Sequence, residues 1–146
     1  MRPATIEDAK WLAPRLRQAD LDECLAATGK RPEQILPGGV ALATAAYTLL
    51  TPSGNPCGVF GVSRTAYEGL GLVWMSATDE ILEHTRIFLR HSQEGVVMMH
   101  DHYQTLWNVV HAENIIHRRW IEWCGFTMGA PHVIRGHDFI EFSKEK

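Results

Sequence analysis

The 146-residue chain has the composition of a single globular domain, with 45% hydrophobic and 21% charged residues. Its formal net charge of −3 gives no electrostatic basis for nucleic-acid binding, and no apolar run has the length of a membrane span. Three widely spaced cysteines, Cys24, Cys57 and Cys124, form no CxxC pair, and no signal peptide is visible. We therefore expect one domain over residues 1–146, a reducing cytoplasm, and neither nucleic acid nor membrane as a partner.

The N-terminal third is predicted to be helical. Thr5 has the features of an N-cap, because acidic residues follow it in the first turn, and Pro14 predicts a break near the end of this helix. A second helix is expected over Asp20–Ala27. A third begins at Pro32 and is expected to be interrupted by Pro37-Gly38-Gly39.

Strands follow in the middle of the chain. Tyr47–Thr51 and Cys57–Val62 flank a turn-rich segment and predict a β-hairpin. Leu70–Ala77 is apolar on both faces and predicts a central strand. Residues 79–104 then carry apolar positions at helical spacing.

The C-terminal part reads as strand, helix and hairpin. Leu106–Val110 predicts a buried strand, and the helix that follows ends at Gly125 with an apolar face of Ile116, Trp120 and Trp123. The segments around Gly136-His137 alternate as two strands of a closing hairpin. All these tryptophans, with Trp74 and Trp107, are most simply core residues.

This last segment resembles the late signature of the GNAT acyl-CoA N-acyltransferase superfamily. The matching residues are Val110, Glu113-Asn114, Arg119 and Gly125-Phe126, and Arg2-Pro3-Ala4-Thr5 resembles the start of many such proteins. The order of the expected strands and helices also resembles the element order of this superfamily. The resemblance implies an α+β, α/β/α-layered fold: a central, mixed and mostly antiparallel sheet, splayed between its fourth and fifth strands, with helices on both faces.

The resemblance also implies where acyl-CoA would bind. Acyl-CoA lies in the splay, with its amide groups on the fourth strand, so Met75, Ser76 and Ala77 are candidate cofactor-binding residues, together with Asn114 and Arg119. The pyrophosphate normally sits on a glycine-rich loop at a helix N-terminus. Here the corresponding residues 83–90 contain no glycine, which leaves Arg86 and Arg90 to meet phosphates by charge.

A second departure concerns the general acid. The resemblance expects a tyrosine where this chain has Ile121, so we consider His111 and its neighbour Glu113 as catalytic candidates, because histidine transfers protons near neutral pH. Two simpler interpretations remain: His111 as a partly exposed strand end, and Glu113-Asn114 as a helix cap. His117-Arg118-Arg119 is interpreted as a solvated helix face. His100-Asp101-His102 is not expected to bind metal, because alternate side chains diverge on a helix.

Tyr103–Val110 narrows the resemblance to small GNAT-like proteins of short-tailed bacteriophages, known from internal-virion or morphogenesis proteins. The sequence predicts an N-acyltransferase of phage or prophage origin that transfers an acetyl group from acetyl-CoA, or another acyl-CoA, to a small-molecule or protein amine. The alternative is a catalytically silent GNAT-fold protein that acts in virion morphogenesis by binding a phage structural protein. The expected location is the host cytoplasm or the virion, and no metal is implied.

Overall fold

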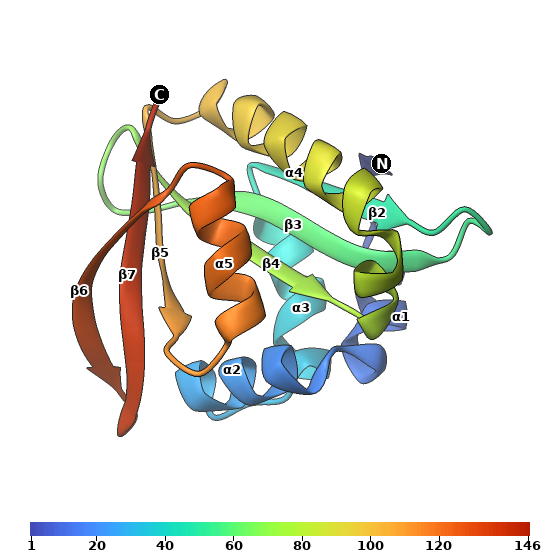
Figure 1. Ribbon diagram of the computed structural model, residues 1–146, viewed down its shortest axis with the longest axis horizontal. Coiled ribbons are helices and arrows are strands. Elements are labelled where there is room, and N and C mark those ends of the chain that lie inside the picture. The colour runs from blue at the N-terminus through green and yellow to red at the C-terminus, as the bar shows by residue number, and fades with distance from the viewer.

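A seven-stranded mixed sheet organises the computed structural model, which describes all residues from Met1 to Lys146 (Figure 1). The strand order is β1-β2-β3-β4-β5-β7-β6, and only the β4–β5 pair is parallel. The strands are β1 (Arg2–Pro3), β2 (Ala45–Leu50), β3 (Pro56–Arg64), β4 (Leu70–Ala77), β5 (Thr105–His111), β6 (Thr127–Ile134) and β7 (His137–Glu145). The predicted fold class is confirmed.

Helices cover both faces of the sheet. They are α1 (Ile6–Leu12), α2 (Gln18–Thr28), α3 (Pro32–Leu42), α4 (Thr85–His100) and α5 (Ile115–Trp123), with the 3₁₀ turns η1 (Ala13–Arg15) and η2 (Asp79–His84). No helix is both long and apolar enough to cross a membrane.

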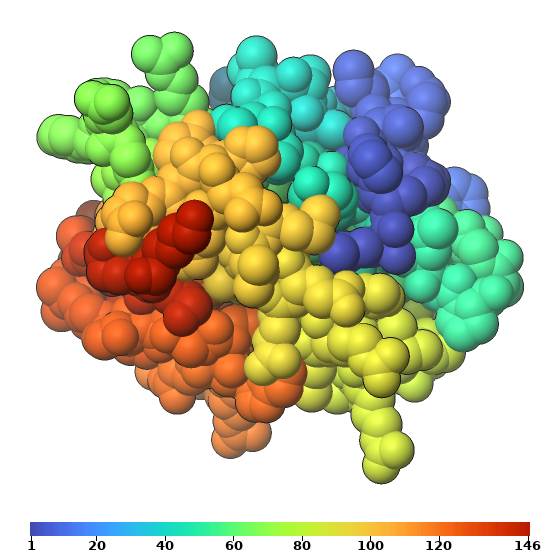
Figure 2. Space-filling view, turned by 90° about the horizontal axis from the view of Figure 1, so that it is seen from above, coloured from blue at the N-terminus to red at the C-terminus, as the bar shows by residue number.

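The two faces of β3 carry two separate cores, because successive side chains of a strand point to opposite sides. Val59 packs with Ala9 and Leu12 of α1 in one cluster. Phe60 packs in the larger cluster, beneath Val96 of α4. In Figure 2, α4 (yellow) lies between the blue-to-cyan N-terminal part and the orange-to-red C-terminal part.

The sheet splays between β4 and β5. These strands pair only over Leu70–Leu72 and Thr105–Trp107. Beyond that point they diverge, while β5 stays paired with β7 along its whole length. At the narrow end of the splay, Asn108 Nδ2 donates to the carbonyl oxygen of Val73 at 2.6 Å. Figure 1 shows the two strands separating, with α2 across the open end and α5 in front of it.

Buried hydrogen bonds tie α1 to the edge of the sheet. The Asp8 carboxylate accepts from Arg2 Nη1 at 2.6 Å and from Thr48 Oγ1 at 2.8 Å. Thr5 is the N-cap of this helix, as predicted, and Asp8 forms a reciprocal capping box with it. One carboxylate therefore joins β1, α1 and β2.

Two local predictions are wrong. The third helix is not interrupted at Pro37-Gly38-Gly39 but runs to Leu42. It continues because Leu36 and Val40 on its inner face pack against the α1 core, and this packing offsets the hydrogen bond that Pro37 cannot make.

The orientation of α5 also differs from the prediction. Ile116 and Trp123 are 48% and 46% exposed, whereas Ile121 is buried. The inward face contains His117, Trp120, Ile121 and Cys124, spaced by three, one and three residues, which is also a helical stripe. His117 therefore faces the sheet and not the solvent. Trp74 and Trp120 pack beside the cores and are only partly buried.

Candidate active site

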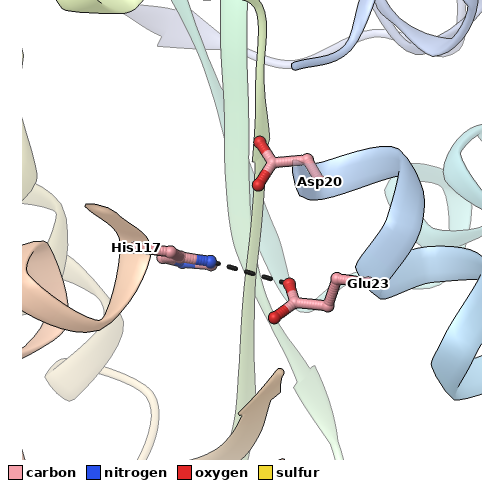
Figure 3. A group of neighbouring side chains, drawn as sticks. All are labelled: Asp20, Glu23 and His117. Carbon is pink, nitrogen blue, oxygen red and sulfur yellow. Dashed lines mark ion pairs between the residues drawn. The ribbon is translucent and has the colours of Figure 1, made fainter. Parts of the chain in front are cut away.

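Three titratable side chains meet at the open end of the splay. Asp20 and Glu23 project from α2, and His117 projects from α5 towards them (Figure 3). One potential ligand atom from each of the three lies within 4.8 Å of the other two. Residues almost a hundred positions apart in the sequence are thus brought together where β4 and β5 end.

Asp20 binds the end of β4. Its Oδ2 accepts the backbone N–H of Ala77 at 3.0 Å, and its Oδ1 accepts from Arg17 Nη1 and Asn114 Nδ2, both at 3.1 Å. Burial raises the pKa of Asp20 above its ordinary value, although the charges of His117 and Arg17 act in the opposite direction. Asp20 thus joins α2 to the end of β4 and to the start of α5.

Glu23 binds the end of β5. Its Oε1 accepts the backbone N–H of His111 at 2.7 Å, and its Oε2 lies 3.6 Å from His117 Nδ1. Burial alone would raise the pKa of Glu23, but the hydrogen bond and charge of His117 outweigh it and lower that pKa. Two carboxylates one turn apart on α2 thus hold the ends of both diverging strands.

His117 completes the ionic group. Burial alone would lower the pKa of His117, but the hydrogen bond and charge of Glu23, aided by Asp20, raise it above its ordinary value. Protonated His117 and Arg17 then balance the two carboxylates. Two oxygens and a nitrogen lie close enough together to hold a metal ion. A divalent cation, however, would have to replace His117 as the partner of Glu23 and would lie next to Arg17.

Two cavities lie in line along β4. The inner cavity, of about 80 Å³, occupies the narrow part of the splay between the sheet and helices α4 and α5. The smaller mouth cavity lies at the wide end, beside Ala77, Leu82 and Ile116. Both are lined by Met75, His117 and Trp120, so these three side chains form the partition between them.

Trp120 is the largest side chain of this partition. Its Nε1 donates to Ser92 Oγ at 2.7 Å, and its ring stacks on Phe88 with the centroids 5.5 Å apart. Since Ser92 and Phe88 belong to α4, the indole bridges α4 and α5.

The backbone N–H of Met75 is a hydrogen-bond donor in the splay that has no acceptor. Val73 and Ala77, on either side, direct their carbonyl groups into the splay, where Asn108 and the backbone N–H of Arg17 donate to them. Because backbone groups alternate along a strand, Met75 faces the same way. No hydrogen bond from a loop, cap or side chain reaches its N–H. This donor therefore points at the partition between the two cavities.

The sequence-predicted catalytic pair lies elsewhere. His111 and Glu113 line an open outer cleft of about 530 Å³ between α2 and the β6–β7 turn. The His111 ring packs edge-on against Phe139 at 5.3 Å, and Glu113 is exposed. Only the backbone N–H of His111 contacts the ionic group, through Glu23.

The predicted cofactor-binding residues separate into two sets. Met75, Ala77 and the buried Asn114 lie at the splay. Ser76 directs its N–H towards β3 by the alternation of the strand, and the side chains of Arg86, Arg90 and Arg119 are exposed on helix surfaces. No structural observation assigns a ligand to the three arginines.

Sequence reasoning missed Arg17, Asp20, Glu23 and His117. The interpretation of His117-Arg118-Arg119 as a solvated face is wrong for His117. A signal was present, because His117 is one turn before Ile121 and one turn after Asn114 on the same side of the helix. Asn114 occupies the N-cap position of α5, but its side chain bonds to Asp20 and does not cap the helix.

No protein-family model and no curated protein matches this sequence. Solved structures do match in fold. A ribosomal-protein-S5-alanine acetyltransferase from Vibrio fischeri superposes with a TM-score of 0.70 at 18% identity, covering 99% of this chain and 91% of that one. The aminoglycoside acetyltransferase AAC(6')-Ib, in complex with coenzyme A and kanamycin, gives 0.70 at 15% identity, with 99% and 93% covered.

A Bacillus subtilis acetyltransferase in complex with CoA gives a TM-score of 0.63 at 14% identity, covering 89% of this chain and 93% of that one. At these identities the similarity establishes the architecture alone. The chain has the fold of the GNAT acetyltransferases.

Proposed function

We propose that this protein is an acyl-CoA-dependent N-acyltransferase whose active site is the splay between β4 and β5. The observation that carries the proposal is the unengaged backbone N–H of Met75, which faces the splay beside the buried His117–Glu23 pair. A donor and an acid–base pair at one point are what acyl transfer from a thioester needs.

Each group has a distinct role in this proposal. The Met75 N–H polarises the thioester carbonyl. Protonated His117 donates to the departing thiolate sulfur, as the tyrosine of the family resemblance would. His117 lies one turn before Ile121, which occupies that tyrosine position, and both face the sheet. The proton lost by the attacking amine returns to His117 through Glu23, so the pair ends the reaction as it began. Asp20 and Arg17 hold α2 in place.

The site fits an acyl thioester better than it fits a pyrophosphate. The mouth cavity opens beside Leu82, just before α4 begins, so a pantetheine arm would arrive from that helix terminus. The glycine cradle is missing. Arg86 lies in the first turn of α4 and Arg90 in the second, both exposed, so phosphates would be held by charge alone. We expect weak, salt-sensitive binding.

Calorimetry with acetyl-CoA tests the proposal directly. Wild-type protein should bind acetyl-CoA, and binding should weaken as salt is raised. With an amine acceptor found by screening, H117Q should lower kcat by about 100-fold or more, as loss of a general acid does. The matched control, H111Q, removes a histidine of the outer cleft and should keep most of the activity. Absence of binding at millimolar acetyl-CoA would reject the enzyme.

One observation favours a second candidate function. The Trp120 indole, held by Ser92 of α4, stands in the partition between the two cavities, where it would narrow the path of a pantetheine arm. In this alternative, the protein is a catalytically silent, phage- or prophage-encoded GNAT-fold protein that binds a virion structural protein. Support for it comes from the resemblance of Tyr103–Val110 to phage proteins. It predicts co-purification with a virion protein from infected cells and no binding of acetyl-CoA even after W120A.

A further inference from the structure

The inner cavity has the lining of a site for a hydrocarbon chain. Its walls include Phe60, Val73, Val96, Met99, Val109 and Phe142, from the sheet and α4. The tie between Asn108 and Val73 closes its narrow end. A ligand that reaches this cavity must therefore end in it.

The polar side chains that line the cavity are already engaged by other groups of the protein. Ser92 Oγ donates to the carbonyl of Phe88 and accepts from Trp120. The Asn108 amide bonds to two backbone groups through both its nitrogen and its oxygen. His117 pairs with Glu23. A water molecule here would find few partners, so an apolar occupant is favoured.

The position of the inner cavity relative to Met75 indicates which part of a bound thioester would occupy it. A thioester carbonyl bound to the Met75 N–H lies at the partition, where both cavities meet. The pantetheine side of the ester occupies the mouth cavity, which lies at the wide end of the splay beside Leu82. The acyl side then points past Trp120 into the inner cavity.

We propose that the inner cavity binds the acyl chain of the donor and that it selects a short chain longer than acetyl, with butyryl as the test case. This inference rests on the proposed function and names its acyl donor. The two carbons of an acetyl group, one of them the carbonyl at Met75, would leave most of about 80 Å³ of apolar space unfilled. Each methylene buried there should tighten binding about fourfold, so two should give about 15-fold.

The test compares CoA, acetyl-CoA and butyryl-CoA by calorimetry on wild-type protein. Butyryl-CoA should bind about 15-fold tighter than acetyl-CoA. Equal or weaker binding of butyryl-CoA overturns the inference and leaves the acyltransferase proposal standing. If none of the three binds, the acyltransferase proposal fails and the inference fails with it.

A cavity-filling variant sharpens the test. V96L adds one methylene to the wall of the inner cavity and should reduce the preference for butyryl-CoA by about fourfold or more, with acetyl-CoA affinity unchanged. The control is V97L, the same substitution at the next residue of α4, which is 66% exposed and should change nothing. V109L fills the cavity from β5 and serves if V96L does not fold. An unchanged preference in a folded cavity variant also overturns the inference.

Discussion

At the residue scale, the two carboxylates of α2 have opposite pKa shifts although they lie one turn apart. Burial raises the pKa of Asp20, since its hydrogen bonds come from neutral donors and one guanidinium. The pKa of Glu23 is lowered because protonated His117 overcomes the effect of burial. Glu23 and His117 therefore form an ion pair whose charge depends on pH near neutrality.

This ion pair predicts the pH dependence of stability. The folded-state pKa of His117 is raised, so its contribution is full below its unfolded pKa of about 6.5 and is lost as pH rises through the folded value. The lowered pKa of Glu23 acts at the acid end, where its contribution is lost as pH falls. We expect the free energy of unfolding in urea to decrease as the pH rises above about 6.5.

H117Q should make this decrease smaller, because glutamine does not titrate in that pH range. H102Q removes an exposed histidine and should keep the wild-type slope. Equal slopes in H117Q and wild type would show that the ion pair does not contribute.

Residues of the site were predictable only where the family resemblance reached them. Met75, Ala77 and Asn114, which the resemblance marks as cofactor-binding candidates, do lie at the splay, and their binding of a cofactor stays a prediction. His117 was missed because its neighbours Arg118 and Arg119 are charged, and three consecutive polar residues suggest a solvated face. Asp20 and Glu23 carry no local signal, since their roles depend on where α2 crosses the sheet.

At the element scale, the rotation of α5 decides what fills the splay. Ile116, Trp120 and Trp123 form a helical stripe as regular as the observed one, so periodicity alone did not choose between them. In the folded protein the buried stripe is the one that contains Ile121, and it places the Trp120 indole against α4. Two other tryptophans are held by the neighbouring strands: the Trp107 indole donates to Glu141 of β7, and the Trp74 indole donates to Ser63 of β3.

W120A tests whether the indole obstructs the splay. Removing it should join the mouth and inner cavities and raise acetyl-CoA affinity, while lowering the free energy of unfolding by about 3 kcal/mol through lost packing. W123A, on the exposed side of α5, is the matched control for both measurements. A W120A protein that is destabilised but binds acetyl-CoA no better would show that the indole is only a packing residue.

Asp8 should be the main determinant of how α1 is held on the sheet. D8A removes a helix cap and leaves Thr48 without its buried acceptor, so we expect a loss of about 3 kcal/mol in urea unfolding. Burial would raise the pKa of Asp8, but hydrogen bonds from Arg2, Thr48 and Thr5 lower it, so its contribution is lost as pH falls. E7A changes an exposed acid of the same turn and should cost little. Similar losses in both variants would argue against this role.

At the scale of the whole molecule, the fold was predictable from the order of its elements. Leu70–Ala77 was predicted with the same limits that the structure gives, because a strand that is apolar on both faces has a strong signal. The order of strands and helices then matched one known architecture. The contents of the splay could not be predicted in this way, because they depend on side chains that three separate elements bring together.

The short pairing of β4 with β5 is the only strand pairing between two sheets of four and three strands. Only three residue pairs join these sheets directly, and all other strand pairing lies within one sheet or the other. The gap can therefore change its width without breaking a ladder of backbone hydrogen bonds. Asn108 reaches from β5 to β4 across the gap, while Asp20 and Glu23 of α2 each bond to the end of one of the two strands. A ligand of a different size would thus be accommodated by breaking and remaking a few side-chain hydrogen bonds, while the backbone pairing of both sheets stays intact.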